Sequence, residues 1–241
     1  MVRAMAYISS LMMPRIQLLK TLPLLAIALW AAALPARDET VAGSAWPTFP
    51  VSQPPSCADP VDLEAALLHA APTLRPGALQ AALSAWGTLQ AQGEVARPLL
   101  TVIDYSLPST AKRLWVFDLA SRRLLFHELV AHGKNSGEDL AQSFSNQDGS
   151  LMTSLGAFVT GTTYDGRNGY SLRLRGMEPG VNDRAEARAI VMHGAPYVDD
   201  GVSLKLGRLG RSHGCPALRP AIARTLIDEI KDRTVLYAWH P

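Results

Sequence analysis

The pattern of hydrophobic and polar residues divides the chain into an early helical part and a later strand-rich part. Asp59 followed by Pro60 is a typical N-cap and first-turn pair, and it predicts a helix that continues to about residue 70. A second helix is predicted over 76–91, because large apolar residues recur there at helical spacing. We therefore expect a short helical N-terminal segment over 60–98.

From residue 99 onward, short segments rich in β-branched and aromatic residues alternate with turns of Gly, Asn, Asp and Ser. The predicted strands are LLTVIDYS, RLWVFDL, RLLFHELVAHG, LGAFVTGTTY, YSLRLRG and ARAIVMHG. A final helix is predicted from residue 220 to about 231, and TVLYAW closes the chain as a strand. This pattern predicts a mainly β fold with flanking helices, in which the strands form a sandwich or a closed sheet.

The N-terminus has the pattern of a secretory signal peptide. Residues 1–20 carry three basic residues and no acidic one, and the apolar run LPLLAIALWAAAL follows. This run is shorter than the about 20 residues that span a bilayer, so 1–36 is interpreted as a cleaved signal, with an uncleaved anchor as the alternative. Cleavage near Ala42 or Ala45 also fits. Residues 37–59, rich in proline, are expected to form a linker, and the mature protein is expected to be periplasmic with no integral membrane span.

Removal of the predicted signal changes the charge balance. The full chain has 23 Lys+Arg against 21 Asp+Glu, and loss of the three basic residues leaves 20 against 21, a net charge of −1. No basic cluster is present in the sequence, so nucleic-acid binding is not predicted.

The candidate chemistry centres on Cys215, one of only two cysteines, in the segment GRSHGCPAL (210–218). A thiolate is a strong nucleophile, and the neighbouring residue types favour one. Gly214 permits a tight turn, so that the amides of Gly214 and Cys215 can point at a developing oxyanion. Arg208 and Arg211 add positive charge that favours a thiolate and suits a carboxylate-bearing substrate.

His193 is the predicted general base. It ends the apolar strand ARAIVMHG, where a rigid strand gives way to a loop. The group that orients its ring is left open between a backbone carbonyl, Asp199 and Asp200.

Several blocks together resemble the L,D-transpeptidases, the YkuD-like peptidoglycan enzymes, and among them the subgroup called murein L,D-transpeptidase catalytic domain. A histidine, 18 residues and then Ser-His-Gly-Cys resemble the active-site signature of that family. The other similar blocks are VAHGKNSG, SFSN, SLGAFVTGTTYDGRNGYSLRLRG, ND, RAIVMHGAPYV and GRLGRSHGCPAL. The resemblance implies a β-sandwich catalytic domain over 99–241, a cysteine thioester mechanism on peptidoglycan stem peptides, and no metal or organic cofactor.

Carried over residue by residue, the resemblance implies Cys215 as nucleophile and His193 as base. It also implies His213 as a second active-site histidine and the amides of Gly214 and Cys215 as the oxyanion hole. The sequence departs from the family just after the cysteine, where the best-known members have Arg or Asn and this chain has Ala217. The nearest arginine, Arg219, is displaced by two residues, so the contact to the substrate carboxylate is left unassigned.

Polar residues in the matched blocks are candidates for binding the substrate. They are Arg211, Ser212, Asn135, Asn146, Tyr164 and Tyr170. A tyrosine hydroxyl assists the oxyanion in some relatives, and the sequence leaves open whether Tyr164 or Tyr170 corresponds to it. His132, in a glycine-flanked loop, is a further candidate for lining the groove.

Other interpretations compete with the catalytic one. Cys215 could be a buried structural thiol, the partner of Cys57 in a disulfide, or a zinc ligand with His193 and His213. Cys57 lies in the proline-rich linker, and no Cys-x-x-Cys or His-Glu-x-x-His motif supports zinc. Two alternative functions also remain: an L,D-carboxypeptidase or cross-link hydrolase that uses water as acceptor, and a non-catalytic peptidoglycan-binding protein.

Overall fold

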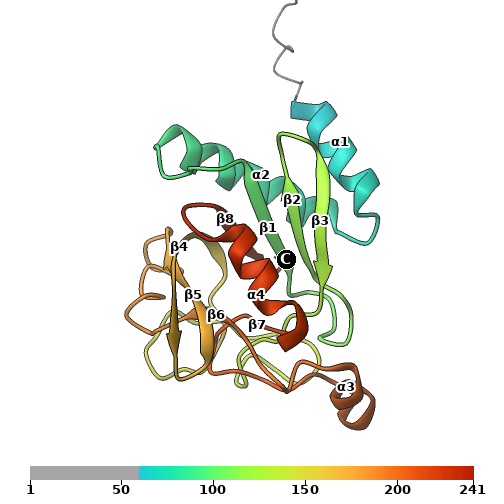
Figure 1. Ribbon diagram of the computed structural model, residues 1–241, viewed down its shortest axis with the longest axis vertical. Coiled ribbons are helices and arrows are strands. Elements are labelled where there is room, and N and C mark those ends of the chain that lie inside the picture. Colours follow the sequence, from blue (N-terminus) through green and yellow to red (C-terminus); the bar gives the residue numbers. More distant parts are fainter. Residues whose placement is uncertain (1–59) are drawn as a thin grey trace, which may run out of the picture. The chain divides into compact units, whose positions relative to one another are not determined.

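A computed structural model describes residues 60–241, and these contain four helices and eight strands (Figure 1). The helices are α1 (Pro60–Ala70), α2 (Pro76–Ala91), α3 (Asp200–Leu206) and α4 (Pro220–Ile230). The strands are β1 (Leu99–Asp104), β2 (Leu114–Asp118), β3 (Arg123–Glu128), β4 (Gly156–Gly166), β5 (Gly169–Gly176), β6 (Val191–Gly194), β7 (Ala217–Leu218) and β8 (Val235–Trp239). The predicted mainly β fold with flanking helices is confirmed. The predicted signal peptide and linker lie outside the described residues.

All eight strands belong to one sheet in the order β3-β2-β1-β8-β4-β5-β6-β7. Most neighbours are antiparallel, whereas β1–β8 and β6–β7 are parallel pairs. Within residues 60–241, no helix has the length and apolar character needed to cross a membrane.

Helices cover both faces of the sheet, which explains why the central strands are apolar at nearly every position. Alternate residues of β1, β2 and β8 point to opposite faces, and each set joins a different core. One core contains Ala223, Leu226, Ile227 and Ile230 of α4. The other contains α1 and α2, so the predicted helical segment shares a core with the sheet.

The segment 129–133 brings the two edges of the sheet together. It follows β3 at one edge, and Ala131 forms an antiparallel bridge with Ala217 of β7 at the other, with an N···O distance of 2.9 Å. Gly133 forms a second bridge with Ser212. The sheet therefore closes at this end, and the predicted long strand RLLFHELVAHG is in fact a strand followed by this connecting segment.

The predicted strand ARAIVMHG is shorter in the structure. It begins at Val191, because residues 185–190 form hydrogen-bonded turns, such as Ile190 N to Ala185 O at 2.9 Å. Ala189 has φ 54°, a left-handed conformation that strand pairing does not accommodate. Helix α3 and the two-residue strand β7 were not predicted.

The core beneath α4 gives a direct test of the fold. Leu226 is fully buried there, and truncating it to alanine leaves a cavity that closely packed neighbours cannot fill. Leu226→Ala is expected to lower the free energy of unfolding by about 2–5 kcal/mol in urea denaturation. The matched control is Leu204→Ala on α3, whose side chain is 86% exposed and whose loss should change stability by less than about 0.5 kcal/mol. Equal effects of the two substitutions would contradict this packing.

Candidate active site

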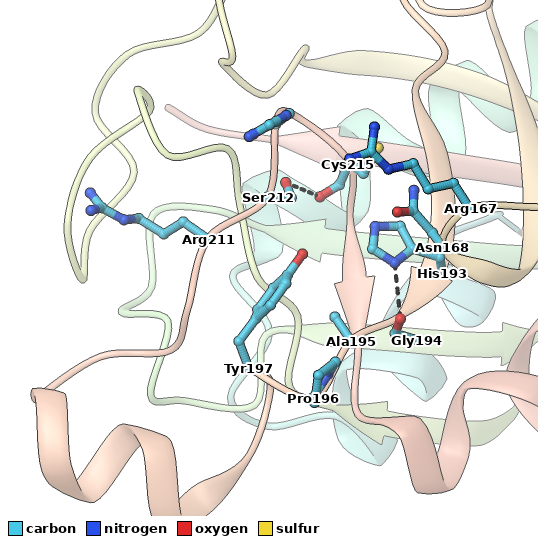
Figure 2. A pocket seen from close by; sticks show the side chains of 11 residues that line it. Arg167, Asn168, His193, Gly194, Ala195, Pro196, Tyr197, Arg211, Ser212 and Cys215 are labelled. Atoms are coloured by element: carbon cyan, nitrogen blue, oxygen red, sulfur yellow. Dashed lines mark hydrogen bonds between the residues drawn. The ribbon is translucent and has the colours of Figure 1, made fainter.

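A cavity of about 490 Å3 opens where β6, β7 and the β4–β5 hairpin meet (Figure 2). Five of the predicted site residues line it: His193, Arg211, Ser212, His213 and Cys215. The parallel pairing of His193 with Ala217 explains this, because it aligns the end of β6 with the residues just after Cys215. The sequence-predicted nucleophile and base therefore face the same space.

Gly214 makes the turn before Cys215 possible. Its φ is 120°, and a Cβ at this position would lie 2.7 Å from the Met152 carbonyl oxygen and 3.0 Å from Ile190. Gly133 packs against the same turn, since its Cβ would lie 3.0 Å from the Gly214 Cα. Any side chain at either glycine would push these backbone segments apart.

Ser212 ties this turn together through its hydroxyl. Its Oγ accepts a hydrogen bond from the Gly214 N–H at 3.0 Å. The same hydroxyl donates a hydrogen bond to the Cys215 carbonyl at 2.6 Å (Figure 2). The Gly214 amide, predicted for the oxyanion hole, is therefore already occupied by Ser212. The Cys215 N–H, by contrast, has no acceptor among residues 60–241 and is available to a ligand.

Cys215 is held as a neutral thiol. Its side chain is buried, and burial raises the pKa of the thiol, against the smaller lowering effects of the Val191 N–H and the Arg188 guanidinium. The Val191 N–H donates to Sγ at 3.5 Å, and Sγ lies 3.8 Å from the Ala189 carbonyl oxygen, its acceptor. The sulfur thus bonds the backbone and needs a base before it can act as a nucleophile.

His193 is present in the form that can act as that base. Its Nδ1 lies 3.0 Å from the Gly194 carbonyl oxygen, and because a carbonyl only accepts, Nδ1 carries the hydrogen. Nε2 is then free to accept a proton. Burial lowers the pKa of His193, so the ring is neutral at neutral pH. The orienting group is a backbone carbonyl, while Asp199 instead caps α3 by accepting from the Gly201 N–H at 2.8 Å.

The tyrosine at the cavity is Tyr197, which was not predicted (Figure 2). Burial and the nearby Cys215 raise the pKa of Tyr197 to about 12, so its hydroxyl keeps its proton and can donate a hydrogen bond. Tyr164 and Tyr170 are not among the residues that line the cavity. Tyr197 belongs to the matched block RAIVMHGAPYV, so proximity to His193 along the chain was the signal that could have identified it.

The charges near Cys215 differ from those predicted. Arg208 and Arg211 both pair with Glu138, at 2.7 Å each, which neutralises much of their positive charge. The cation that favours a thiolate at Cys215 is Arg188, whose guanidinium donates to the Met152 carbonyl at 2.8 Å and to Ser150 Oγ at 3.1 Å. The prediction that Arg208 and Arg211 supply this charge is therefore corrected.

The two predicted asparagines lie outside the cavity wall. Asn135 donates from Nδ2 to the Ser150 carbonyl at 2.8 Å, and Asn146 donates to Asp183 at 2.7 Å. Ala217 is buried in an apolar cluster with Ala131 and other small and aliphatic residues. Its position cannot present a polar contact to the cavity.

His132 lies beneath the site and not along the groove. It is fully buried, and its Nδ1 lies 2.8 Å from Nη2 of the buried Arg113. Arginine only donates, so Nδ1 is the acceptor and Nε2 carries the hydrogen, which faces the Gly137 carbonyl at 3.3 Å. Arg113 also donates to the Val130 carbonyl from Nε at 3.1 Å and from Nη2 at 3.0 Å. This pair fastens the connecting segment 129–133 beneath the turn at Gly214.

The structure bears on one of the alternative roles of Cys215, that of a zinc ligand. In residues 60–241, no three His, Cys, Asp or Glu side chains are grouped as metal ligands, so His193, His213 and Cys215 do not form such a set. Cys57, the disulfide alternative, lies outside the described residues. A thiol, a neutral imidazole and a tyrosine hydroxyl line one cavity, and nucleophilic acyl chemistry requires groups of these kinds.

Comparisons with known proteins add independent findings. The model of the YkuD_2 family, described as L,D-transpeptidase catalytic domain, matches residues 70–239. Among curated proteins, none matches this chain.

Three of the solved structures that match this chain are the following. An L,D-transpeptidase from Mycobacterium smegmatis is 16% identical, with a TM-score of 0.37 and 59% of each chain covered. L,D-transpeptidase 1 from Mycobacterium tuberculosis is 15% identical, with a TM-score of 0.35 and coverage of 59% of this chain and 62% of that one. The helical cell shape determining protein Pgp2 from Campylobacter jejuni is 14% identical, with a TM-score of 0.39 and coverage of 63% and 54%. Each match spans less than two thirds of the other protein's length.

Burial of His132 is expected to make the free energy of unfolding depend on pH. Burial and the adjacent Arg113 lower the pKa of His132 to about 4, whereas an unfolded histidine titrates near 6.5. The unfolded chain therefore binds the extra proton between pH 6.5 and 4, so this group's contribution to the free energy of unfolding is constant above that window and falls as pH decreases through it. From pH 7.5 to pH 5 the loss due to His132 is expected to be about 2 kcal/mol.

Urea denaturation of His132→Asn at both pH values tests this, because the asparagine oxygen can still accept from Arg113 but does not titrate. The variant should lose about 2 kcal/mol less than the parent protein between pH 7.5 and pH 5. His69→Asn, at an exposed position of α1, is the control and should keep the parent's pH dependence. An unchanged pH dependence in His132→Asn would contradict the depressed pKa.

Proposed function

Because the chain belongs to the L,D-transpeptidase catalytic domain family, we propose that it is a peptidoglycan L,D-transpeptidase that works through a thioester on Cys215. The observation that carries the proposal is the placement of Cys215 and a neutral His193 with a free Nε2 at one cavity. The substrate is a stem peptide of peptidoglycan, cut between an L-centre and a D-residue. His213 lines the same cavity and is a second, less central histidine of the site.

Acylation begins when Sγ leaves its backbone contacts at Val191 and Ala189 and turns towards the substrate. Its proton moves to Nε2 of His193 as the sulfur attacks the carbonyl carbon of the scissile bond. The tetrahedral intermediate then breaks its C–N bond, and the imidazolium returns the proton to the departing amine. A thioester remains on Cys215, and the D-residue leaves with its new N–H bond.

The oxyanion of that intermediate needs hydrogen-bond donors that are already in place. The free N–H of Cys215 and the hydroxyl of Tyr197 are the donors best supported by the geometry. The Gly214 N–H would have to exchange its bond with Ser212 Oγ to contribute. We therefore propose that Gly214 mainly permits the turn, which its φ of 120° supports.

Deacylation uses an amine of a second stem peptide, which we assign to the side chain of a diaminopimelate residue. The amine attacks the thioester carbonyl while His193 takes one of its protons, the C–S bond breaks, and the proton returns to the sulfur. The same thioester resolved by water would make the protein an L,D-carboxypeptidase or a cross-link hydrolase. These steps need no metal or organic cofactor.

Location follows from the substrate, because peptidoglycan lies outside the cytoplasmic membrane. We propose that 1–36 is a signal peptide, that 37–59 is a linker, and that the protein works in the periplasm. The catalytic domain then extends from about residue 60, since α1 and α2 share a core with the sheet.

Incubation with a tetrapeptide muropeptide, with products identified by mass, tests the proposed reaction. The parent protein is expected to form cross-linked dimers, and Cys215→Ala is expected to form none while keeping its cooperative melt. The turn around Cys215 is stabilised by Ser212 and the glycine contacts, so loss of the sulfur should leave the fold intact.

Each alternative outcome of that experiment has a distinct meaning. Tripeptides without dimers would identify water as the acceptor, and unchanged substrate would favour a peptidoglycan-binding protein. Loss of the folded state in Cys215→Ala would assign the thiol a structural role instead.

Acylation of Cys215 by a carbapenem separates the roles of the two histidines. The strained lactam is an electrophile that the thiolate can open, and His193 must first remove the thiol proton. His193→Ala should therefore slow adduct formation by about 100-fold or more, and His213→Ala by much less. Intact-protein mass spectrometry follows the single adduct over time.

Two controls accompany this measurement. His69→Ala, on an exposed face of α1, should match the parent rate, and Cys215→Ala should form no adduct. An adduct on Cys215→Ala would place the reactive thiol at Cys57, and a larger effect of His213→Ala would reverse the assignment of the base.

A further inference from the structure

We infer that Arg167, at the tip of the β4–β5 hairpin, binds a carboxylate of the peptide substrate. This carboxylate is attached to the same carbon as the amine that leaves or attacks during the reaction. This inference deepens the proposed function and rests on it. It assigns a recognition residue that the sequence left open, because the family's contact after the cysteine is replaced here by Ala217.

The charge around the cavity supports a carboxylate ligand. Two arginines line the cavity, Arg167 and Arg211, and none of its lining residues is acidic. Arg211 is already bound to Glu138 at 2.7 Å and to the Gly137 carbonyl at 2.9 Å. Arg167 is exposed, and its side chain takes part in no ion pair or hydrogen bond among residues 60–241. Its planar guanidinium can therefore bind a carboxylate by donating two parallel hydrogen bonds, the geometry that arginine favours.

Strand pairing places Arg167 on the His193 side of the cavity. Gly166 pairs with Gly169, so Arg167 and Asn168 form the two-residue tip of the hairpin. Two residues further along, Ser171 pairs with His193 across β5 and β6. Figure 2 shows Arg167 and Asn168 extending from this hairpin over the space that His193 and Cys215 face.

Tyr164 and Tyr170, which the sequence analysis predicted to bind the substrate, instead hold the hairpin in position. The Tyr164 ring covers Gly166, where a Cβ would lie 2.5 Å from the ring, and the Arg173 guanidinium stacks 4.4 Å from the ring centre. The Tyr170 hydroxyl donates to Asp228 of α4 at 2.5 Å. Arg167 thus extends from a braced turn, which reduces the entropy lost when it binds a ligand.

The position beside His193 identifies which carboxylate is bound. His193 gives its proton to the leaving amine and later takes one from the acceptor amine, so both amines occupy this side of the thioester carbon. The leaving D-residue carries a carboxylate on the carbon that bears its amine, and so does the side-chain amine of diaminopimelate. One cation near His193 can therefore recognise both partners in turn. Water lacks this group, so the contact favours transfer over hydrolysis.

The other arginine available for this contact is committed elsewhere. Arg219 bonds Glu128 from Nε at 3.1 Å and lies 3.6 Å from Asp200. Ala217 is buried in its apolar cluster. The carboxylate contact has therefore moved, in this chain, from the strand after the cysteine to the hairpin opposite it.

Peptide binding to the Cys215→Ala protein tests the inference without turnover. Titration calorimetry compares a tetrapeptide stem that ends in D-alanine with the same peptide ending in D-alaninamide. The carboxamide is expected to bind about tenfold more weakly, as for loss of one charge-assisted hydrogen-bonded contact. In Cys215→Ala/Arg167→Gln the two peptides should bind alike, and Arg167→Lys should restore part of the difference. Arg123→Gln, which removes the same charge from an exposed position on β3, should keep the full tenfold ratio.

Product analysis with the catalytic protein gives a second readout. Arg167→Gln should shift the products of tetrapeptide muropeptides from dimers towards tripeptides, because the acceptor amine loses its contact and water does not. A general loss of structure would lower both products together and leave their ratio unchanged.

The two proposals fail in different ways. The role of Arg167 would be overturned if the tenfold difference in affinity between the two peptides persisted in Cys215→Ala/Arg167→Gln. It would also be overturned if both peptides bound equally to the Cys215→Ala protein that retains Arg167, even if dimers form normally. Carboxylate-dependent binding that needs Arg167, in a protein that forms no acyl-enzyme, would overturn the proposed reaction and support the recognition site.

Discussion

The close approach of three backbone segments at Gly133 and Gly214 determines the geometry of the site. One segment follows β3, one precedes β4 and one precedes β7, so they come from distant parts of the sheet. A Cβ on Gly133 would lie 2.5 Å from the Leu151 carbonyl oxygen, which shows how little space separates them. Leu151 itself has φ 58°, a conformation that costs energy for a residue with a side chain and persists because its surroundings enforce it. The closure of the sheet, the turn before Cys215 and the burial of its sulfur all depend on this contact.

The buried pair of Arg113 and His132 stabilises the contact between these segments, although burial of the Arg113 charge is itself unfavourable. A guanidinium removed from water needs hydrogen-bond partners, and Arg113 makes four hydrogen bonds, to the Leu107 and Val130 carbonyls and to the His132 imidazole. Its guanidinium also lies 5.1 Å from the Tyr105 ring centre. The pair therefore links the chain at 129–133 to the main sheet through directional bonds. Apolar packing alone would allow this irregular segment more than one position, and the turn before Cys215 would shift with it.

Periodicity predicted the strands and helices well because both faces of the sheet are covered and the apolar positions follow strand and helix spacing. The boundaries of α1 and α2 agree with prediction, and the family inferred from the motifs is the one that matches residues 70–239. The beginning of β6 was missed because Ala189 takes a left-handed conformation that alanine rarely adopts. The motif indicated that Cys215 and His193 share one site, and both line the cavity. Tyr197 could have been identified from its closeness to His193 along the chain. Arg188 and Arg167 could not, because their positions depend on strand register and on long-range contacts.

The resting state of Cys215 has a consequence for how the protein survives where we place it. Peroxides and disulfide-exchange partners react with thiolates, and a buried thiol whose pKa is raised presents very little thiolate to them. The periplasm is an oxidising compartment, in which an activated cysteine would be steadily lost. In the reaction we propose, the reactive thiolate forms only when His193 takes the proton of Cys215, so the reactivity of the sulfur is confined to the acylation step. Burial of Cys215 as a neutral thiol thus protects the sulfur from oxidation when no substrate is being processed.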